Sequence, residues 1–229
     1  MDEIITLNLG FTRVFLLKTD FGFIQIDAGL KYTSRRYFRL LKRRRINQED
    51  IKLIVVTHAH SDHVGALKKI KTASNAKVLI HEKDRDALVR GIQAEIVPIT
   101  LVGKCFKNII PKRMHLYDPV EPDIVINNEY SLLEFGINAK VVHTPGHTSG
   151  TISVIDGNGN AFIGFTAHGY PQKLTPESPA MAVDLDAVFS SWELLIKEGV
   201  KKLHPAHGKP FSVEVIKIIL EKKDRERIS

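Results

Sequence analysis

The feature that most constrains this chain is a nearly continuous apolar run, IKLIVVT at residues 51–57, that ends directly in HAHSDH at residues 58–63. An apolar run of this length predicts a strand covered on both faces, as in a sheet that lies between other layers. The histidines and the aspartate would then lie at the carboxyl end of that strand. Packing alone is a poor explanation for them. A polar turn whose histidines satisfy backbone groups is the weaker alternative.

The rest of the sequence predicts strands in two groups with helices among them. Runs of β-branched or alternating apolar residues indicate strands at 4–9, 13–18, 22–27, 77–81, 131–135, 139–143, 151–155 and 160–164. The sequence DGNGN at 156–160 is typical of a hairpin. Helices are expected at 32–45, with Thr33 and Ser34 as N-caps, at 66–73, 82–90 and 185–199, and from Ser212 onward.

A chain of 229 residues is suited to one domain, and we expect residues 1–229 to form one. Residues 91–122 break the alternation of helices and strands and carry four of the ten prolines. This segment is predicted to be a lid or insertion, because long loops in compact domains are usually functional. Phe106, Ile109 and Ile110 are its expected apolar contacts to substrate.

Cysteine content limits the metal chemistry that is open to the chain. Cys105 is the only cysteine, so an intramolecular disulfide and a thiolate-rich zinc site are excluded. It is interpreted as a small buried apolar residue. A metal site would have to use histidine and carboxylate ligands.

The formal net charge of +7 is concentrated in RRYFRLLKRRR at 35–45 and KKDRER at 222–227. Both runs are interpreted first as solvated helix faces, and a nucleic-acid partner is the weaker interpretation because few aromatic residues are interleaved with the basic ones. No apolar stretch is long enough for a membrane span, and no secretory signal is visible at the N-terminus. We therefore expect a cytoplasmic protein without a membrane partner, and we leave a homodimer open.

The spacing within HAHSDH allows its side chains to converge. On an extended backbone His58 and His60 can point to the same side, and Asp62 and His63 follow on the turn into the next helix. Imidazole and carboxylate ligands suit zinc, and also iron or manganese. A metal site is the preferred interpretation.

HAHSDH has the HxHxDH form of the metallo-β-lactamase superfamily, and the chain resembles that family in two further segments. VVHTPGHTSG at 141–150 and LHPAHGKP at 203–210 look like its next metal segment and its closing segment. The order and spacing agree from about residue 7 to residue 210. The resemblance implies an αββα four-layer sandwich of the α+β class, with a metal cleft at one edge.

The same resemblance implies a ligand set. His58, His60 and His147 would hold a first ion, and Asp62, His63 and His207 a second. Asp27 matches a family position where an aspartate ends a strand beneath the metals, and its implied role is to accept a hydrogen bond from a ligand imidazole or a backbone amide.

One position departs from the family pattern. The family usually places an aspartate between the two metals, in a stretch of the form GDT, whereas this chain reads FIGFTAHG and has Phe165 there. A phenyl ring cannot bridge two cations. Three interpretations stay open, namely an active site with one ion, a site with two ions bridged by hydroxide or phosphate, and a site that keeps metal but has lost catalysis. His168 is a weaker candidate as a replacement ligand.

The remaining histidines receive lesser roles. His143 and His204 are expected at strand ends as structural groups or as supports for the ligands. His81 and His115 have no partner that the sequence identifies.

The function implied by the resemblance is hydrolysis of a small ester, thioester or lactone by a metal-activated water, with Asp62 orienting or deprotonating that water. The alternatives are a phosphodiesterase or nuclease, and a catalytically degenerate module that binds a metal or a ligand.

Overall fold

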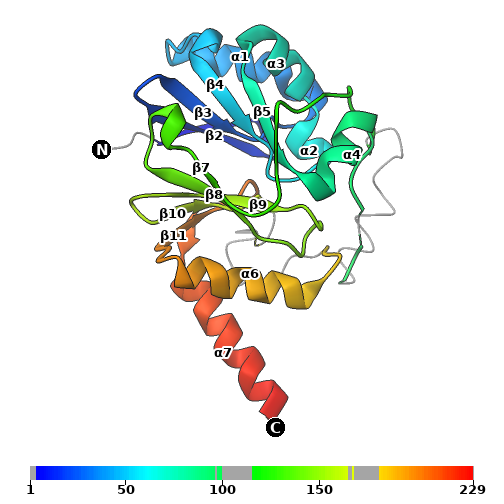
Figure 1. Cartoon of the computed structure of the whole chain (residues 1–229), viewed down its shortest axis with the longest axis vertical. Coiled ribbons are helices and arrows are strands. Elements are labelled where there is room, and N and C mark those ends of the chain that lie inside the picture. The colour runs from blue at the N-terminus through cyan, green and yellow to red at the C-terminus, as the bar shows by residue number, and fades with distance from the viewer. Residues whose placement is uncertain (1–3, 96, 100–114, 165–166, 168–180, 229) are drawn as a thin grey trace.

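The chain forms two six-stranded sheets in a computed structural model that describes residues 4–95, 97–99, 115–164, 167 and 181–228. In the first sheet the order follows the sequence: β1 (Ile4–Asn8), β2 (Arg13–Thr19), β3 (Gly22–Ile26), β4 (Ile51–Val55), β5 (Lys77–His81) and β6 (Ile124–Ile126). In the second sheet the order is β12 (Phe211–Ser212), β11 (Lys202–His204), β10 (Asn160–Phe162), β9 (Ile152–Asp156), β8 (Ala139–His143) and β7 (Tyr130–Ser131). Figure 1 shows the two sheets between helical layers.

Strands β3 to β6 run parallel to one another, whereas β1 and β2 pair antiparallel. The second sheet is antiparallel except where β10 pairs with β11. Because β3, β4 and β5 are parallel, their carboxyl ends lie at the same edge of the first sheet. The histidine-rich stretch therefore begins at an edge where the end of β3 and the end of β5 lie on either side of it.

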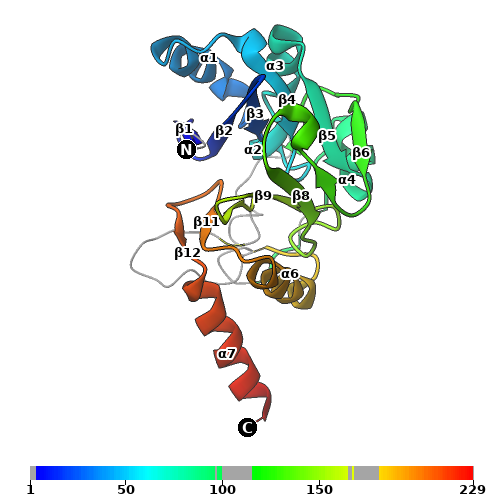
Figure 2. The same cartoon turned by 60° about the vertical axis from the view of Figure 1, so that its left-hand side comes forward.

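Helices cover the outer face of each sheet. The first sheet carries α1 (Ser34–Arg43), α2 (Ser61–Val64), α3 (Leu67–Ser74) and α4 (Glu82–Arg90), with short 3-10 turns at Lys31–Thr33 and Gln48–Asp50. The second sheet carries α6 (Leu185–Lys197) and the first part of α7 (Glu214–Ile228). Both views show α7 projecting away from the sandwich (Figures 1 and 2).

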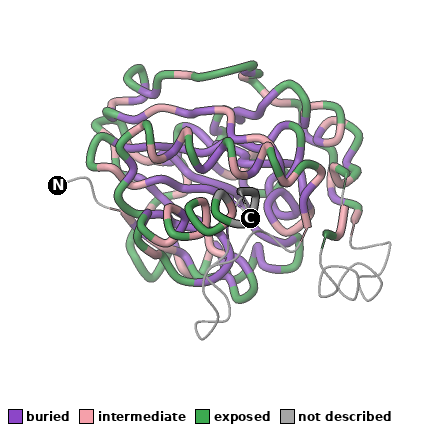
Figure 3. Tube along the Cα trace, turned by 90° about the horizontal axis from the view of Figure 1, so that it is seen from below, coloured by how far each residue is buried: buried purple, intermediate pink, exposed green. Residues whose placement is uncertain are grey.

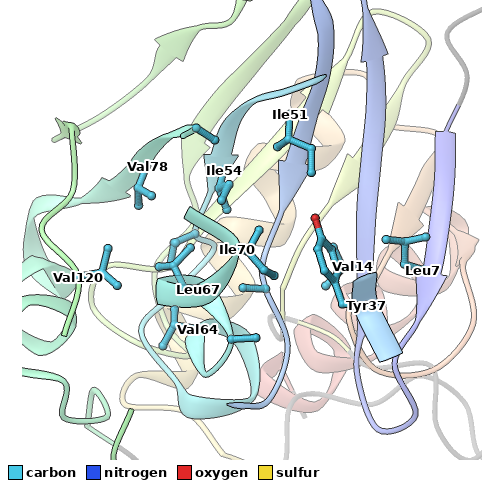
Figure 4. Close-up of a cluster of buried hydrophobic side chains, with 14 of the residues drawn as sticks. Leu7, Val14, Tyr37, Ile51, Ile54, Val64, Leu67, Ile70, Val78 and Val120 are labelled. Atoms are coloured by element: carbon cyan, nitrogen blue, oxygen red, sulfur yellow. The ribbon is translucent and has the colours of Figure 1, made fainter. Parts of the chain in front are cut away.

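The alternation of side chains along β2 explains why three apolar cores form. Val14 and Leu16 point into the core beneath the helices, whereas Phe15 and Leu17 point between the sheets. The same alternation in the second sheet separates the core between the sheets from a third core under α6, where Trp192 is buried. Figure 4 shows part of the first core. Three cores between four layers confirm the αββα sandwich expected from the sequence. Seen from below, the trace of the chain is mostly buried through the centre of the molecule (Figure 3).

Most of the predicted elements are confirmed. The strands near the N-terminus, the apolar run at 51–55 and the helix at 82–90 have the predicted type, and Gly157 to Gly159 turn the predicted hairpin between β9 and β10. The predicted N-cap is only partly right. Thr33 occupies the cap position of α1, but its hydroxyl donates to Leu30 O instead of capping the helix.

The predicted strand at 131–135 is wrong. β7 ends at Ser131, and Leu133–Phe135 forms a 3-10 turn. Leu132 and Phe135 are buried while Leu133 is 66% exposed, so burial recurs every third residue, as a 3-10 turn requires, and does not alternate. A short apolar run cannot distinguish these two patterns by composition.

The basic run at 35–45 lies mainly on the solvent side of α1, as expected, with Arg35, Arg39 and Arg43 exposed. Within the described residues, no helix is both long enough and apolar enough to cross a membrane.

Candidate metal centre

The loops that follow β4, β8 and β11 meet at one edge of the sandwich. Each delivers ligand-type side chains there, and α2 supplies the remainder. The structure sorts these side chains into the two groups that the sequence predicted, one of His58, His60 and His147 and one of Asp62, His63 and His207. Within each group, the candidate ligand atoms all lie within 4.8 Å of one another.

The first cluster consists of three buried imidazoles. His147 Nε2 lies 3.1 Å from His60 Nδ1. The ring of His58 lies 4.7 Å, centroid to centroid, from each of the other two rings. The three rings are nearly perpendicular to one another, so their edges converge on one small volume.

The second cluster adds a carboxylate to two imidazoles. His63 Nε2 lies 3.3 Å from His207 Nε2, and Asp62 Oδ2 lies 3.0 Å from His207 Nε2 and 3.5 Å from His63 Nε2. The rings of His58 and His63 lie 4.0 Å apart, so the two clusters adjoin. Asp62 is the most accessible of the six, with 23% of its side chain exposed.

The outward nitrogens of four imidazoles face oxygens that can only accept a hydrogen bond. His60 Nε2 faces Glu95 O, His147 Nδ1 faces Met181 O, and His207 Nδ1 faces Phe11 O, at 3.4, 2.8 and 3.1 Å. His63 Nδ1 faces an Asp27 carboxylate oxygen at 2.7 Å. Each outward nitrogen must therefore carry the proton, which leaves a lone pair on the inward nitrogen of a neutral ring.

With these tautomers, the inward nitrogens of two ring pairs face each other, each with a lone pair. His60 Nδ1 lies 3.1 Å from His147 Nε2, and His63 Nε2 lies 3.3 Å from His207 Nε2. Such pairs repel unless a cation or a proton lies between them. In addition, among the described residues, His58 Nε2 is buried without a hydrogen-bond partner. Three imidazoles in one group, and two imidazoles with a carboxylate in the other, are donor sets that suit zinc, iron or manganese. The residues present therefore fit a metal ion in each group.

Asp27 contacts both clusters, directly through His63 and indirectly through Thr57 and His58. It accepts hydrogen bonds from an imidazole and from a backbone amide, as the resemblance implies. Its carboxylate accepts from the amide and the hydroxyl of Thr57 and from His63 Nδ1. Because the Thr57 hydroxyl donates its only proton to Asp27, its oxygen accepts from His58 Nδ1 at 3.1 Å. Asp27 itself has φ 60°, a left-handed conformation that aspartate and asparagine tolerate better than most residues. Gln25 and Val55 fix its backbone carbonyl and amide.

Burial sets the protonation of the first cluster. Burial lowers the pKa of His60 to about 4 and outweighs the nearby Asp62 carboxylate, which acts to raise it. Burial and the adjacent histidines also hold the pKa of His58 and His147 well below the ordinary value of 6.5. All three rings are therefore neutral at neutral pH, which is the form that ligates a metal.

In the second cluster the carboxylates dominate. Burial alone would lower the pKa of His63, but Asp27 and Asp62 outweigh burial and raise it. Burial alone would raise the pKa of Asp62, but His63 and His207 outweigh burial and hold that pKa well below its ordinary value. Asp62 is thus an ionised carboxylate on the accessible side of the site.

The lesser histidines lie outside both clusters. His143 and His204 end strands β8 and β11, as predicted. The ring of His143 stacks on that of His81 at 3.8 Å, and His204 bonds Asn160. His115 is held through its backbone carbonyl, which accepts from Gln93 N.

Several predicted residues lie outside the part of the chain that the structure describes. They are Phe165, His168, Cys105, Phe106, Ile109 and Ile110. Gly164, just before Phe165, is described. A Cβ added to Gly164 would lie 2.6 Å from Thr57 Oγ1 and 3.2 Å from His58 Nδ1, so the chain passes directly beside the first cluster at this point.

The two described ends of the segment 91–122 pair with each other beside the candidate metal ligands. Ile92 and Leu116 form an antiparallel bridge, and Ala94 N donates to Ala59 O, between His58 and His60. The segment thus leaves and rejoins the fold at the ligand loop. Its proposed action as a lid remains a prediction, because residues 100–114 are not described.

Two groups of functional residues were not identified from the sequence. The carbonyls of Phe11, Glu95 and Met181 orient ligand rings, but every residue has a carbonyl, so side-chain identity gives no signal for them. Asp84 contacts two ligand loops. It follows β5, the parallel neighbour of β4, and the shared edge of parallel strands could have indicated it.

Comparison with known proteins places the chain in a family. A sequence model of the metallo-beta-lactamase superfamily matches residues 7–207. The chain is 29% identical over 186 residues to a probable metallo-hydrolase of Methanocaldococcus jannaschii, covering 81% of this chain and 82% of that protein. It is 30% identical over 120 residues to a hydroxyacylglutathione hydrolase of Haemophilus influenzae, covering 52% of this chain and 50% of that enzyme.

Solved structures show the same fold. An archaeal metallo-beta-lactamase superfamily protein from Sulfolobus tokodaii superposes with a TM-score of 0.67 at 19% identity, covering 97% of this chain and 86% of that one. A subclass B3 metallo-beta-lactamase of Bradyrhizobium japonicum superposes with a TM-score of 0.68 at 19% identity, covering 100% of this chain and 91% of that one. At this identity the likeness concerns the fold alone.

Proposed function

Since this chain belongs to the metallo-β-lactamase superfamily, we propose that it is a metal-dependent hydrolase that cleaves a small ester, thioester or lactone. It holds one or two zinc ions, the first tightly in the cluster of His58, His60 and His147 and a second more weakly in the other cluster. Iron and manganese are the alternative ions, because the same donors suit them.

The observation that carries this proposal is the convergence of three buried, neutral imidazoles, those of His58, His60 and His147. Among the described residues, His58 Nε2 has no hydrogen-bond partner there. A protein that only needed these histidines for packing would be expected to place a donor opposite an acceptor. Here five backbone or side-chain oxygens turn the protonated nitrogens outward and leave the inward ones as ligands.

A divalent ion bound in such a site would lower the pKa of a bound water molecule and would polarise the scissile carbonyl. Asp62 is the residue of this chain that is placed to handle that water, because it is ionised and partly exposed beside both clusters. Its lowered pKa keeps the carboxylate ionised, so that it can accept a hydrogen bond from water, and makes it a weak base. We therefore propose that Asp62 orients the water molecule by accepting a hydrogen bond from it, and that it does not act as the general base.

The substrate class rests on two supports. One matched relative is named a hydroxyacylglutathione hydrolase, and the match spans half of that enzyme. The segment 91–122 begins and ends at the ligand loop, where a lid would cover a small substrate. Phosphodiester cleavage is the rival chemistry, because the same metal site would polarise a phosphoryl oxygen.

The test is turnover of two panels, one of esters, thioesters and lactones and one of phosphodiesters, with metal content measured on the same preparation. We expect turnover of the first panel that chelator abolishes and zinc restores. Turnover of the phosphodiesters alone would transfer the activity to the rival class. Bound metal without turnover of either panel would mean that the chain is a metal-binding module, in line with Phe165 in place of the bridging aspartate.

A further inference from the structure

A buried carboxylate outside both clusters joins the two loops that form the first one. Asp84 lies in the first turn of α4, directly after β5, and is 2% exposed. One oxygen, Oδ2, accepts from Ala59 N at 2.8 Å and from the Thr148 hydroxyl at 3.0 Å. The other, Oδ1, accepts from Gly150 N at 3.0 Å.

Two of the three partners of Asp84 are immediate neighbours of candidate ligands. Ala59 lies between His58 and His60, and Thr148 follows His147. The other side of Ala59 is also held, because its carbonyl accepts from Ala94 N at 3.0 Å. Both the N–H and the carbonyl of Ala59 are therefore held by hydrogen bonds, and Asp84 accepts the one from the N–H.

Thr148 is oriented to donate to Asp84. Its own amide donates to Thr151 Oγ1 at 2.9 Å, and its hydroxyl lies 2.9 Å from the same Thr151 oxygen. The Thr151 hydroxyl can donate to Thr148 Oγ1, which leaves the Thr148 proton for Asp84. Gly150 lets the carboxylate approach, because a Cβ there would lie 2.5 Å from Asp84 Oδ1.

We propose that Asp84 is a positioning residue that sets the distance between the loop of His58 and His60 and the loop of His147, and so sets the affinity of the first cluster for metal. The inference rests on the proposed metal binding of that cluster. Both oxygens of Asp84 accept, and an amide of the same size would present a donor to at least one of the three N–H or O–H groups.

The chain offers a matched control in Asp156. This aspartate is also buried, at 4% exposure, and it also accepts three hydrogen bonds, from Asn158 N, Asn160 N and Asn160 Nδ2. Its partners lie in the turn between β9 and β10 and at the first residue of β10, and they include none of the six candidate ligands or their neighbours. Replacement of either aspartate removes a comparable set of bonds, so a purely structural role predicts comparable consequences.

The experiment measures the zinc affinity of metal-free Asp84→Asn, Asp156→Asn and wild type by competition with a chromophoric chelator, together with their urea unfolding and the visible spectrum of the cobalt form. We expect Asp84→Asn to bind the first ion about 10- to 100-fold more weakly and to shift the cobalt bands. We expect Asp156→Asn to lose stability only. Equal affinities and spectra in both variants would overturn the proposal.

A second pair of variants keeps the proposal testable if Asp84→Asn does not fold. Thr148→Val removes one donor to Asp84 at nearly constant shape, and Thr148→Ser keeps it. We expect weaker zinc binding in the valine variant and recovery in the serine variant. Identical zinc binding in Thr148→Val and Thr148→Ser would also overturn the positioning role of Asp84. Failure of wild type to bind any metal would instead refute the proposed function, and the positioning role with it.

Discussion

His63 Nδ1 lies 2.7 Å from Asp27 Oδ2, and both side chains are almost fully buried. This contact fixes the tautomer of His63 and aims its Nε2 at the second cluster. The same carboxylate holds Thr57, whose hydroxyl oxygen lies 3.1 Å from His58 Nδ1. One aspartate therefore orients a ligand of each cluster.

Replacing Asp27 by Asn is expected to weaken metal binding at the second cluster by about 10- to 100-fold, because the charge that orients and polarises His63 is lost. Asparagine is the informative change, since it tolerates the left-handed backbone at this position. The measurement is competition for zinc against a chelator. As a control, Asp118→Asn removes an exposed carboxylate that pairs with Lys31, and it should bind metal as wild type does. Equal affinity in the two variants would contradict the role of Asp27.

Replacing His58 or His147 by Ala is expected to remove most of the metal held by the first cluster, because each change takes one of three imidazoles. Elemental analysis after purification at a fixed zinc concentration measures it. The controls are His81→Ala and His143→Ala, whose rings stack on each other outside both clusters. Full metal content in both His58→Ala and His147→Ala would refute the ligand assignment.

The stability of the metal-free protein should fall as the pH is lowered from about 6.5 to about 4. In this window His58, His60 and His147 are protonated in the unfolded chain but neutral in the folded one, because their folded-state pKa values are lowered. The unfolded state binds more protons, so acid favours it. His60 alone accounts for about 3 kcal/mol.

His63 acts in the opposite direction. Its pKa is raised, so its contribution is present below 6.5 and is lost as the pH rises through the folded-state value. Three histidines with lowered pKa values act against one with a raised pKa, so we expect acid to destabilise the protein overall. The urea midpoint, followed with chelator present, measures this, and His60→Gln should reduce the dependence on pH. A midpoint that stays constant between pH 6.5 and 4 would contradict the neutral state of the first cluster.

Part of the candidate site could be predicted because its spacing is local. His58 and His60 lie two residues apart at the end of one apolar strand, and Asp62 and His63 follow on α2, whereas His147 and His207 were expected only from the resemblance to the family. The alternation along β2 likewise predicts which face meets which core. These features depend on residues that are close in the sequence, so the order and periodicity of apolar residues are enough to predict them.

The support of the ligands could not be predicted in the same way. Asp84 bonds residues 25, 64 and 66 positions away, and His207 bonds the carbonyl of Phe11 across 196 positions. Such pairs are created by the stacking of strands and leave no local pattern. The wrong strand at 131–135 has the opposite cause, since its pattern is local but too short to separate two periods.

The last prediction concerns the position where this chain departs from its family. Phe165→Asp should raise the zinc content from about one toward two ions per chain, because a carboxylate would offset the repulsion between two cations and could contact both. The described chain supports the placement, since Gly164 abuts Thr57 and His58 at the first cluster. Phe165→Asn is the matched control, because asparagine has the shape of aspartate without its charge. This variant should bind as much zinc as the wild type does. The measurement is elemental analysis of the three proteins at equal zinc, with circular dichroism to show that each is folded. Two tightly bound ions in the wild type, or one ion in a folded Phe165→Asp, would show that Phe165 is not what limits the second ion.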